Sequence, residues 1–499
     1  MMENKQTISG RLRAAMAMHA VAGRVAISGS GASVSYAALA DMIDSYALGF
    51  HRWGIARGDL IGLCAPKTIS TVAAYFGAIQ AGGCPCVIDD AQSPQTIADQ
   101  ANSVGMRHLA FADEACLHRN KAVAAADVQL CRLDTLNASG AYQDPGLGPK
   151  DRAMLLFTSG STGKPKGVVL SHQAMIVNAE GVIAHTGISP ADRLLHVMPL
   201  YHTNGINNQL VTPFLAGAEV VLIERFRAAE TVQALRDWRP SYMTGVPTMF
   251  ARMLPFVGSH ASFLGLRFLR CGSAPITRAL HEEIEATFGV PLIVSYGLSE
   301  ATCTSTMNPP SARRIGTIGT VLAGQTVALF NPGTDQQAPP GGEGEIRITG
   351  PMLMEGYLGA TEQPIINGWL CTGDLGQFDD DGYLAITGRI KDVIIRGGEN
   401  LSPALMESKI VLDPGVRDCC VVGMPSEDLG EVPIAFVVLH QGEIPDAERI
   451  KARVRSDLSR IYVPDQVRFV EALPLNPVGK VDRKTLRVWA KEVNSKRIP

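Results

Sequence analysis

The chain has 499 residues, of which 46% are hydrophobic and 19% charged, and its formal net charge is -3. At about 150 residues per domain, this length allows roughly three domains with well-buried cores, and the composition excludes a largely disordered chain. The near-balanced charge excludes a basic field that would coat nucleic acid, so no nucleic-acid partner is expected.

The chain contains 10 cysteines, too few for a disulfide framework at this length. The close pairs lack the spacing of a zinc site: Cys84 with Cys86, and Cys419 with Cys420. We therefore expect buried thiols and a reducing compartment, which makes the cytoplasm the default location. Residues 11–16 favour a first surface helix over a signal sequence, and no apolar run is long enough for a membrane span.

Along the first part of the chain, apolar runs alternate with helical patterns, a rhythm typical of βαβ units. Strands are expected at residues 60–65, 85–88, 220–223 and 268–271, and the alternation continues around residues 106–112. Helices are expected at residues 75–81, 230–238 and 277–288, the last of them entered at a proline. The pattern predicts parallel sheets covered by helices, and hence an α/β fold with a large body of fused βαβ-type subdomains.

The pattern changes twice towards the C-terminus. From residue 326 to 348, short apolar runs alternate with Gly- and Pro-rich turns, which predicts a small antiparallel or β-barrel-like lobe. Beyond the charged turn at residues 388–392, a compact α+β region is expected, with helices near residues 401–411 and 447–458. This turn is the predicted boundary between an N-terminal body, residues 1–388, and a C-terminal lid, residues 389–499.

The most informative segment is residues 155–170, which read Leu-Leu-Phe-Thr-Ser-Gly-Ser-Thr-Gly-Lys-Pro-Lys-Gly-Val-Val-Leu. Two apolar strands flank a loop whose glycines let backbone N–H groups converge on an anion, while its hydroxyls and lysines add donors and positive charge. The loop is suited to an oligophosphate. It is not a Walker A motif, because Lys164 precedes Pro165 and the return to a strand provides no helix N-terminus. A flexible surface turn is the alternative.

Further motifs follow in a fixed order along the chain. They are Gly-Ser-Ala-Pro at 272–275, Tyr-Gly-Leu-Ser-Glu at 296–300, Gly-Glu-Gly-Glu-Ile at 342–346, Thr-Gly-Asp-Leu at 372–375, Gly-Arg-Ile-Lys-Asp at 388–392, Gly-Gly-Glu-Asn at 397–400 and Pro-Leu-Asn-Pro-Val-Gly-Lys at 474–480. Together with the phosphate loop, this ordered set resembles the acyl-adenylate-forming superfamily, which includes acyl-CoA synthetases, luciferases and the adenylation domains of peptide synthetases. The resemblance covers essentially the whole chain and implies a mobile lid domain.

The resemblance also implies which residues bind ATP and Mg2+. The residues that match the loop holding the β- and γ-phosphates are Thr158, Ser159, Gly160, Ser161, Thr162, Gly163 and Lys166. Glu300, with Thr158, matches the magnesium site, since this metal prefers oxygen ligands. The residues expected around adenosine are Gly272, Ser273, Ala274, Pro275, Tyr296, Gly297 and Ser299. Asp374 matches the carboxylate that accepts hydrogen bonds from the ribose hydroxyls, and Arg389 is expected at the ribose or the phosphate.

Three other family positions imply a change of conformation. Lys480 matches the lysine that stabilises the charge growing on the carboxylate and the α-phosphate during adenylation. Lys391 occupies the hinge position, at which rotation is expected to withdraw Lys480 after pyrophosphate leaves. The same rotation is expected to bring a glycine-rich loop to the CoA tunnel. The tunnel residues that this loop contributes are Gly397, Gly398 and Glu399.

The carboxylic acid is harder to predict. Residues 199–208 resemble the family's motif between acid pocket and CoA tunnel, with His202 as the aromatic gate and Gly297 also near the pocket. If a helix follows residue 205, Asn204, Asn207 and Asn208 share one face, which suits a small or polar acid. One exposed helix face would explain the three amides equally well. By general pattern the sequence resembles small- and medium-acid CoA ligases, including malonyl- and oxalyl-type enzymes, but no arginine for a second carboxylate is evident.

These observations predict an ATP- and Mg2+-dependent acid–CoA ligase. It would convert a carboxylic acid into acyl-AMP with release of pyrophosphate, and then into acyl-CoA with release of AMP. The runner-up passes the acyl group to a carrier protein's phosphopantetheine or to another nucleophile, such as an amine. A phosphate-loop NTPase and a non-catalytic nucleotide sensor are rivals from other classes. A monomer and a homodimer are both compatible with the sequence.

Overall fold

The computed structural model describes residues 6–29, 31–121, 128–140, 144–159, 165–258, 262–361, 363–475 and 481–494. The chain forms two compact units, residues 1–327 with 347–371 and residues 328–346 with 372–499. It passes from one unit to the other inside three strands: β16 (Thr326–Phe330), β17 (Gly344–Thr349) and β20 (Trp369–Phe378). Across the described ranges, no helix is long and apolar enough to cross a membrane. The boundary at residue 388 stays a prediction.

The first unit is built on a nine-stranded sheet whose central strands are parallel. Its strands, in spatial order, are β15 (Thr320–Val321), β14 (Thr306–Met307), β13 (Leu292–Tyr296), β12 (Phe268–Cys271), β11 (Tyr242–Gly245), β9 (Arg193–His196), β10 (Glu219–Leu222), β1 (Val25–Gly29) and β2 (Ala32–Ser35). Parallel strands need crossover helices, and burial on both faces explains their continuous apolar sequences.

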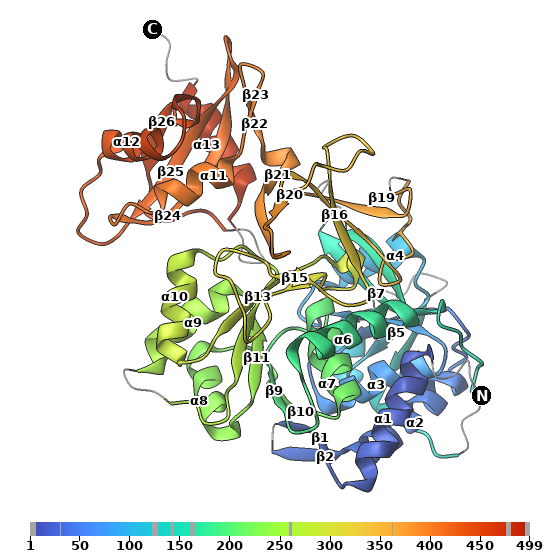
Figure 1. Cartoon of the computed structure of the whole chain (residues 1–499). Coiled ribbons are helices and arrows are strands. Elements are labelled where there is room, and N and C mark those ends of the chain that lie inside the picture. The colour runs from blue at the N-terminus through green and yellow to red at the C-terminus, as the bar shows by residue number, and fades with distance from the viewer. Residues whose placement is uncertain are drawn as a thin grey trace. The chain divides into compact units, whose positions relative to one another are not determined.

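Three helices cover one face of this sheet (Figure 1): α8 (Ala228–Trp238), α9 (Pro247–Val257) and α10 (Arg278–Phe288). Their buried side chains, such as Phe250 and Ile284, pack with Leu269 of β12 in one core. Helix α10 has clear end signals, because the Thr277 hydroxyl accepts from the N–H of Leu280 and Gly289 ends the helix with a left-handed φ of 70°.

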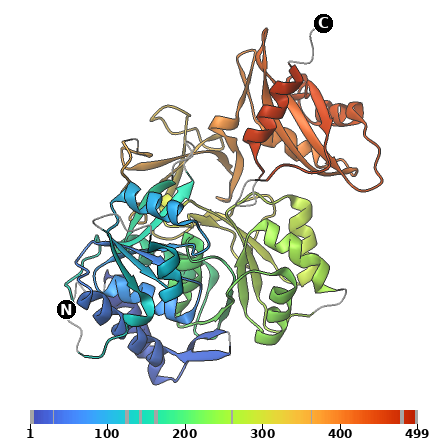
Figure 2. The same cartoon turned by 180° about the vertical axis from the view of Figure 1, so that it is seen from behind.

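The opposite side of the first unit carries a second, four-stranded parallel sheet. It contains β4 (Cys84–Ile88), β3 (Leu60–Cys64), β5 (His108–Phe111) and β6 (Gln129–Arg132). Its helices are α2 (Tyr36–Arg52), α3 (Ile69–Gln80), α4 (Pro94–Val104) and α5 (Glu114–Arg119), followed by a 3-10 turn, Leu133–Thr135. Figure 2 shows these blue and cyan elements on one side of the unit and the yellow-green helices on the other.

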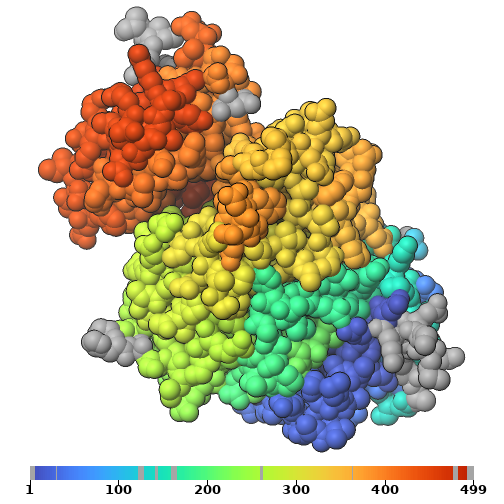
Figure 3. All heavy atoms as spheres, viewed as in Figure 1, coloured from blue at the N-terminus to red at the C-terminus, as the bar shows by residue number. Residues whose placement is uncertain are grey.

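The remaining helices of the first unit are α1 (Ile8–Val21), α6 (His172–Thr186) and α7 (Thr212–Ala216). The backbone N–H of Ile8 donates to His172 Nδ1 at 3.2 Å, and Arg11 pairs with Glu180, so α1 is fixed against α6. The space-filling view in Figure 3 shows the blue N-terminal residues beside the teal and green ones. A three-stranded sheet completes the unit: β18 (Tyr357–Leu358), β8 (Pro165–Ser171) and β7 (Arg152–Ser159).

The second unit contains another sheet, with β23 (Glu399–Leu401), β22 (Ile394–Arg396), β25 (Gly430–Leu439), β24 (Val416–Ser426) and β26 (Gln466–Phe469). Its helices are α11 (Pro403–Ile410), α12 (Ala447–Asp457) and α13 (Arg483–Asn494), with 3-10 turns at Ile390–Asp392 and Arg460–Tyr462. The predicted small lobe, residues 326–348, supplies β16 and β17 to a five-stranded sheet with the order β16-β17-β20-β19. In this sheet β20 pairs antiparallel with β19 (Ile365–Ile366) and with β21 (Leu384–Arg389).

The structure confirms the α/β fold and the type of each predicted element. The predicted strands correspond to β3, β4, β10 and β12, and the predicted helices to α3, α8, α10, α11 and α12; the alternation around residues 106–112 contains β5. All 10 cysteines lie in described residues and are free thiols. Some observed strands and helices begin or end at other residues than predicted. Helix α3, predicted from residue 75, begins at Ile69, where Thr68 caps it.

Candidate active site

The predicted phosphate loop joins two antiparallel strands, as the sequence pattern indicated. Strands β7 and β8 pair so that Thr158 lies opposite Lys166. Strand β18 pairs with the other edge of β8 and places Tyr357 opposite Val168. The loop residues themselves lie outside the described part of the chain: Gly160, Ser161, Thr162 and Gly163. Their roles, and that of Ser159 at the end of β7, stay predictions.

Tyr357 brings two predicted site residues to one place. The Lys166 ammonium lies 4.7 Å from the centroid of its ring, and its hydroxyl donates to Glu300 Oε1 at 2.6 Å. Burial and the Glu300 charge raise the pKa of Tyr357, so the phenol stays a donor. Tyr357 was not predicted as a site residue, because in the sequence it is one aromatic residue after Gly356 in a largely apolar segment.

The turn that carries Glu300 is fixed to the same segment. Glu300 lies in a 3-10 turn, Ser299–Ala301, and its carbonyl accepts from the N–H of Met354 at 2.8 Å. Thr302 follows with a left-handed φ of 57°, and its hydroxyl donates to the Met352 carbonyl at 2.6 Å. These bonds hold the carboxylate in a defined orientation.

The predicted adenosine-binding residues lie at the C-terminal ends of two neighbouring parallel strands, β12 and β13, where α/β folds bind ligands. A Cβ at Gly272 would lie 3.0 Å from Ser295 Oγ, and a Cβ at Gly297 only 2.2 Å from the Cys303 carbonyl oxygen. Glycine is therefore required at Gly297 by close backbone approach. Tyr296 is half-buried, so its side chain is not fully enclosed in the core.

The predicted gate and its amides lie on one continuous segment. His202 is half-buried and its ring lies edge-on to Tyr201, with centroids 4.8 Å apart. The segment Asn204–Val211 forms a π-helix in which every residue is buried, which excludes the exposed-face explanation. Asn208 Nδ2 lies 3.4 Å from Asn204 Oδ1, so these two amides do share a face.

Asn207 does not share that face, which corrects the expectation of three converging amides. Its Nδ2 donates to Asn178 Oδ1 at 3.1 Å, and Asn178 in turn donates to the Thr304 carbonyl at 2.7 Å. The expectation assumed α-helical spacing, whereas a π-helix closes i→i+5 bonds and turns less per residue. Asn207 therefore points away from Asn204 and towards helix α6.

Lys67, not predicted as a site residue, lies beneath the gate segment. Its Nζ donates to the Met198 carbonyl at 3.1 Å and lies 3.4 Å from His196 Nδ1. His196 Nε2 lies 2.8 Å from the Gly205 carbonyl and so carries the ring proton, which leaves Nδ1 to accept from Lys67. Burial lowers the pKa of Lys67 to about 7.

This pKa predicts a pH-dependent effect of Lys67→Met on stability. Lysine in an unfolded chain has a pKa of about 10.4, so between about pH 7 and 10 the unfolded state binds a proton that the folded state does not. Stability from this group therefore rises with pH through that window. Urea denaturation at pH 7 and pH 9 should show that the free energy of unfolding of the wild type rises relative to that of Lys67→Met at pH 9. A difference that stays constant between the two pH values would contradict the assignment.

In the second unit, Asp374 and Arg389 face each other across β20 and β21. Arg389 Nε lies 2.6 Å from Asp374 Oδ1, and the carboxylate is only 3% exposed while the guanidinium is 52% exposed. An ion pair between a buried carboxylate and a half-exposed arginine orients the carboxylate towards a ligand better than solvent would. Asp374 and Arg389, both expected from the sequence to lie near the ribose, are therefore adjacent.

The predicted hinge residue, Lys391, is exposed in the turn Ile390–Asp392. The Asp392 carboxylate accepts from Arg487 of α13 at 2.8 Å, and Arg487 also donates to the Lys391 carbonyl at 3.3 Å. Because residue 392 is fastened to α13, any pivot near this turn falls at Lys391 or before it.

The predicted CoA-tunnel loop is the tip of a hairpin between β22 and β23. Gly397 and Gly398 have φ values of 58° and 88°, the two left-handed residues that a tight hairpin turn requires. Both glycines and Glu399 are exposed. Lys480 lies outside the described residues, so its role stays a prediction.

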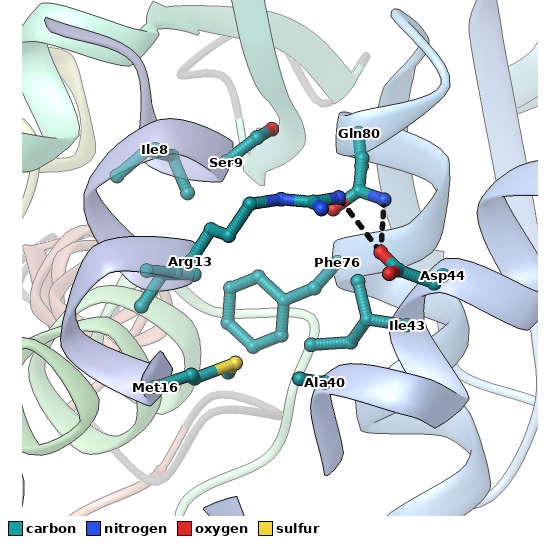
Figure 4. A pocket seen from close by; sticks show the side chains of 10 residues that line it. Ile8, Ser9, Arg13, Met16, Ala40, Ile43, Asp44, Phe76 and Gln80 are labelled. Atoms are coloured by element: carbon teal, nitrogen blue, oxygen red, sulfur yellow. Dashed lines mark hydrogen bonds and ion pairs between the residues drawn. The ribbon is translucent and has the colours of Figure 1, made fainter. Parts of the chain in front are cut away.

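A pocket between α1, α2 and α3 lies apart from these residues (Figure 4). Asp44, in the wall of this pocket, forms an ion pair with Arg13 at 2.8 Å and accepts a hydrogen bond from Gln80 at 2.6 Å. The apolar side chains of Phe76 and Met16 also line the pocket. None of the predicted site residues lines this pocket, so we assign it no part in the chemistry.

Comparison with known proteins agrees with the motif order. The model of the AMP-binding enzyme family matches residues 14–358, and that of the AMP-binding enzyme C-terminal domain matches residues 405–480. The chain belongs to the AMP-binding enzyme family. Residues predicted for phosphate, metal and adenosine lie in the first matched range, and Lys480 is the last residue of the second.

Several relatives of this AMP-binding enzyme are named CoA ligases. It is 36% identical to a sulfoacetate–CoA ligase of Cupriavidus necator over 68% of this chain and 67% of the relative. It is 30% identical to a feruloyl-CoA synthase of an Amycolatopsis species over 95% of this chain and 97% of the relative. The crystal structure of ATP-bound MatB from Rhodopseudomonas palustris matches with a TM-score of 0.89 at 28% identity, covering 98% and 99% of the two chains.

This AMP-binding enzyme is therefore an AMP-forming acid–CoA ligase. It activates a carboxylic acid with ATP as an acyl-adenylate, releasing pyrophosphate, and transfers the acyl group to CoA, releasing AMP. Enzymes of this kind use ATP, Mg2+ and CoA. Of the acceptors considered from sequence, CoA is favoured over a carrier protein or an amine, and the NTPase and sensor interpretations are not supported.

Proposed function

We propose that Lys166, Glu300 and Thr158 form the part of the site that binds the ATP phosphates and Mg2+. The observation that carries the proposal is the Tyr357 ring, which holds Lys166 over its face and Glu300 at its hydroxyl. Glu300 has one oxygen bonded to Tyr357 and a second without a bond among the described residues, a hard anionic ligand that suits Mg2+. When bound, Mg2+ neutralises phosphate charge.

Tyr357→Phe tests this arrangement. The variant keeps the ring beneath Lys166 but removes the hydroxyl that orients Glu300, and a hydrogen bond to a charged group contributes about 1.5–3 kcal/mol. We expect pyrophosphate release to slow by about tenfold or more, with a higher Mg2+ concentration at half-maximal rate. Tyr462→Phe, in the second unit, is the matched control. An unchanged Mg2+ dependence in Tyr357→Phe would contradict the role of Glu300.

The residues predicted for the nucleoside are proposed to keep those roles, considered in each unit by itself. Gly272, Ser273, Ala274, Pro275, Tyr296, Gly297 and Ser299 would contact adenosine, and Asp374 would accept hydrogen bonds from the ribose hydroxyls. Arg389 supports this role because its guanidinium holds one Asp374 oxygen in place while half its own surface stays exposed. It can then contact the ribose or the phosphate.

The two half-reactions would share one site through rotation at Lys391, between a body of residues 1–388 and a lid of residues 389–499. Lys480 would act in the first half-reaction by stabilising charge that grows in the transition state. Gly397, Gly398 and Glu399 would act in the second by forming part of the CoA tunnel. The attachment of Asp392 to α13 supports a pivot at the preceding residue.

The acid is proposed to be small and polar. Asn204 and Asn208 are buried amides on the segment that carries the His202 gate, and they make this segment polar. The sulfoacetate–CoA ligase relative is named for such an acid, whereas the feruloyl-CoA synthase is named for a larger aromatic one. The cytoplasm is proposed as the location because the cysteines are free thiols.

A pyrophosphate-release screen tests the substrate class. Short, dicarboxylic, aromatic and medium-chain acids are compared at equal concentration, with and without CoA. We expect the largest kcat/KM among short polar acids. A preference for aromatic or medium-chain acids would contradict the proposed acid while leaving the ligase activity in place.

A further inference from the structure

Arg270, on β12, is a buried cation without a carboxylate partner. It is 4% exposed, and within the described ranges its guanidinium forms no ion pair. Buried charges are normally paired, because an uncompensated charge in the interior is costly. Burial also lowers the pKa of Arg270 to about 10, which leaves it charged at neutral pH. A cation kept here at such a cost needs a compensating anion.

The groups around Arg270 orient it without neutralising it. Its Nε donates to Ser295 Oγ at 3.1 Å, and its Nη2 donates to Thr304 Oγ1 at 2.6 Å. Hydroxyls are neutral, and the nearby Cys303 is a thiol because burial raises its pKa. A guanidinium has five N–H donors, so these two bonds leave donors on Nη1 and Nη2 for another acceptor.

The cluster lies among the residues already assigned to the active site. Asn208, which follows the His202 gate, donates to Thr304 Oγ1 at 3.1 Å and to Cys303 Sγ at 2.9 Å. Arg270 precedes the Gly272 turn by two residues, and its partner Ser295 precedes Tyr296. The nucleotide, metal and gate segments therefore converge on this guanidinium.

The backbone next to Thr304 is strained, and this strain helps to position the groups around Arg270. Thr302 and Cys303 both have positive φ values, 57° and 100°, in residues that rarely adopt them. This conformation brings the Cys303 carbonyl against Gly297, where a Cβ would lie 2.2 Å away. The chain therefore bends sharply between two residues of the cluster. Glu300, the proposed Mg2+ ligand, lies before the bend, and Thr304, the partner of Arg270, lies after it.

We propose that Arg270, together with Asn208 and Thr304, binds a second anionic group on the acid substrate. The substrate is then a short carboxylic acid with a distal carboxylate or sulfonate. This inference rests on the proposed function and specifies its substrate class. A planar guanidinium pairs with either anion through two N–H groups, and the anion supplies the charge that the protein lacks. A neutral side chain on the acid would leave Arg270 uncompensated.

Matched acids test the inference on the wild-type enzyme. The rate of pyrophosphate release is measured for succinate, monomethyl succinate, 3-sulfopropanoate and butanoate, with Mg2+-ATP and CoA. We expect kcat/KM for at least one dianion to exceed that for the ester and butanoate by about tenfold to a hundredfold. The two dianions show whether carboxylate or sulfonate is preferred, and a preference for either supports the proposal. Equal or higher rates with the monoanions would overturn it.

Variants of Arg270 assign the preference to this residue. Arg270→Met should reduce the dianion-to-ester ratio to about one, mainly through a higher KM for the dianion, whereas Arg270→Lys should retain part of it. Arg278→Met, at an exposed arginine on α10, is the matched control, and melting temperatures check folding. Should both Arg270 variants unfold, Thr304→Val, which removes the hydroxyl beside the guanidinium, should lower the same ratio.

The outcomes separate this inference from the proposed function. A wild-type enzyme that adenylates none of the acids would count against the proposed function itself. A wild-type enzyme that adenylates monoanionic acids, with a ratio that Arg270→Met does not alter, would refute only the role of Arg270.

Discussion

Replacing Lys480 with alanine is expected to slow acyl-adenylate formation by about 100- to 1,000-fold. Electrostatic groups aimed at charge that develops in the transition state have effects of this size. The net charge of -3 offers no general attraction for ATP, and the local cations proposed to attract it are Lys166, Arg389 and Lys480. Pyrophosphate release with the preferred acid measures the loss.

The second half-reaction distinguishes a catalytic Lys480 from a structural one. Thiolysis of supplied acyl-AMP by CoA should stay near the wild-type rate in Lys480→Ala, because the proposed rotation of the lid would by then have withdrawn the lysine. Lys491→Ala, at an exposed lysine on α13, is the control and should leave both steps intact. Equal loss of both half-reactions in Lys480→Ala would sink the assignment.

Lys391→Pro is expected to produce the reverse pattern. Proline fixes φ near -65° and restricts the preceding residue, so it stiffens the turn at which the lid would rotate. Asp392 stays fastened to α13 through Arg487, so the neighbouring bonds offer no alternative pivot on that side. Adenylation should continue, while thioester formation should fall by about a hundredfold, the order of loss when reacting groups are misplaced.

Lys391→Gly is the matched control for this experiment. Glycine removes the same side chain but leaves the turn free, so both half-reactions should proceed. If Lys391→Gly loses thioester formation as severely as Lys391→Pro does, then the lysine side chain is needed rather than rotation of the turn. Retention of full thioester formation in Lys391→Pro would place the pivot elsewhere.

The sequence predicted the elements whose signals are local. Strand β12 is a short apolar run, and helix α10 has Thr277 at one end and Gly289 at the other, so periodicity and end signals agree. The pairing of Asp374 with Arg389 followed from two motifs that turned out to be register partners on adjacent strands. In these cases the local pattern and the tertiary structure favour the same answer.

Contacts made by distant segments could not be predicted in this way. Tyr357 meets Glu300 from 57 residues away, and Arg270 meets Thr304 from 34 residues away, so no spacing rule joins them. Asn207 was misplaced for a different reason, because the segment winds as a π-helix and its phase differs from that of an α-helix. The residues proposed to set substrate preference belong to this second group.

The most direct test of the central claim is product analysis of a single reaction mixture. The enzyme is incubated with Mg2+-ATP, a preferred short acid and CoA, and the nucleotides, pyrophosphate and thioester are quantified together over time. We expect AMP, pyrophosphate and acyl-CoA in equal amounts, and acyl-AMP with pyrophosphate when CoA is left out. Formation of ADP and phosphate, or acyl-AMP that added CoA fails to discharge, would contradict it.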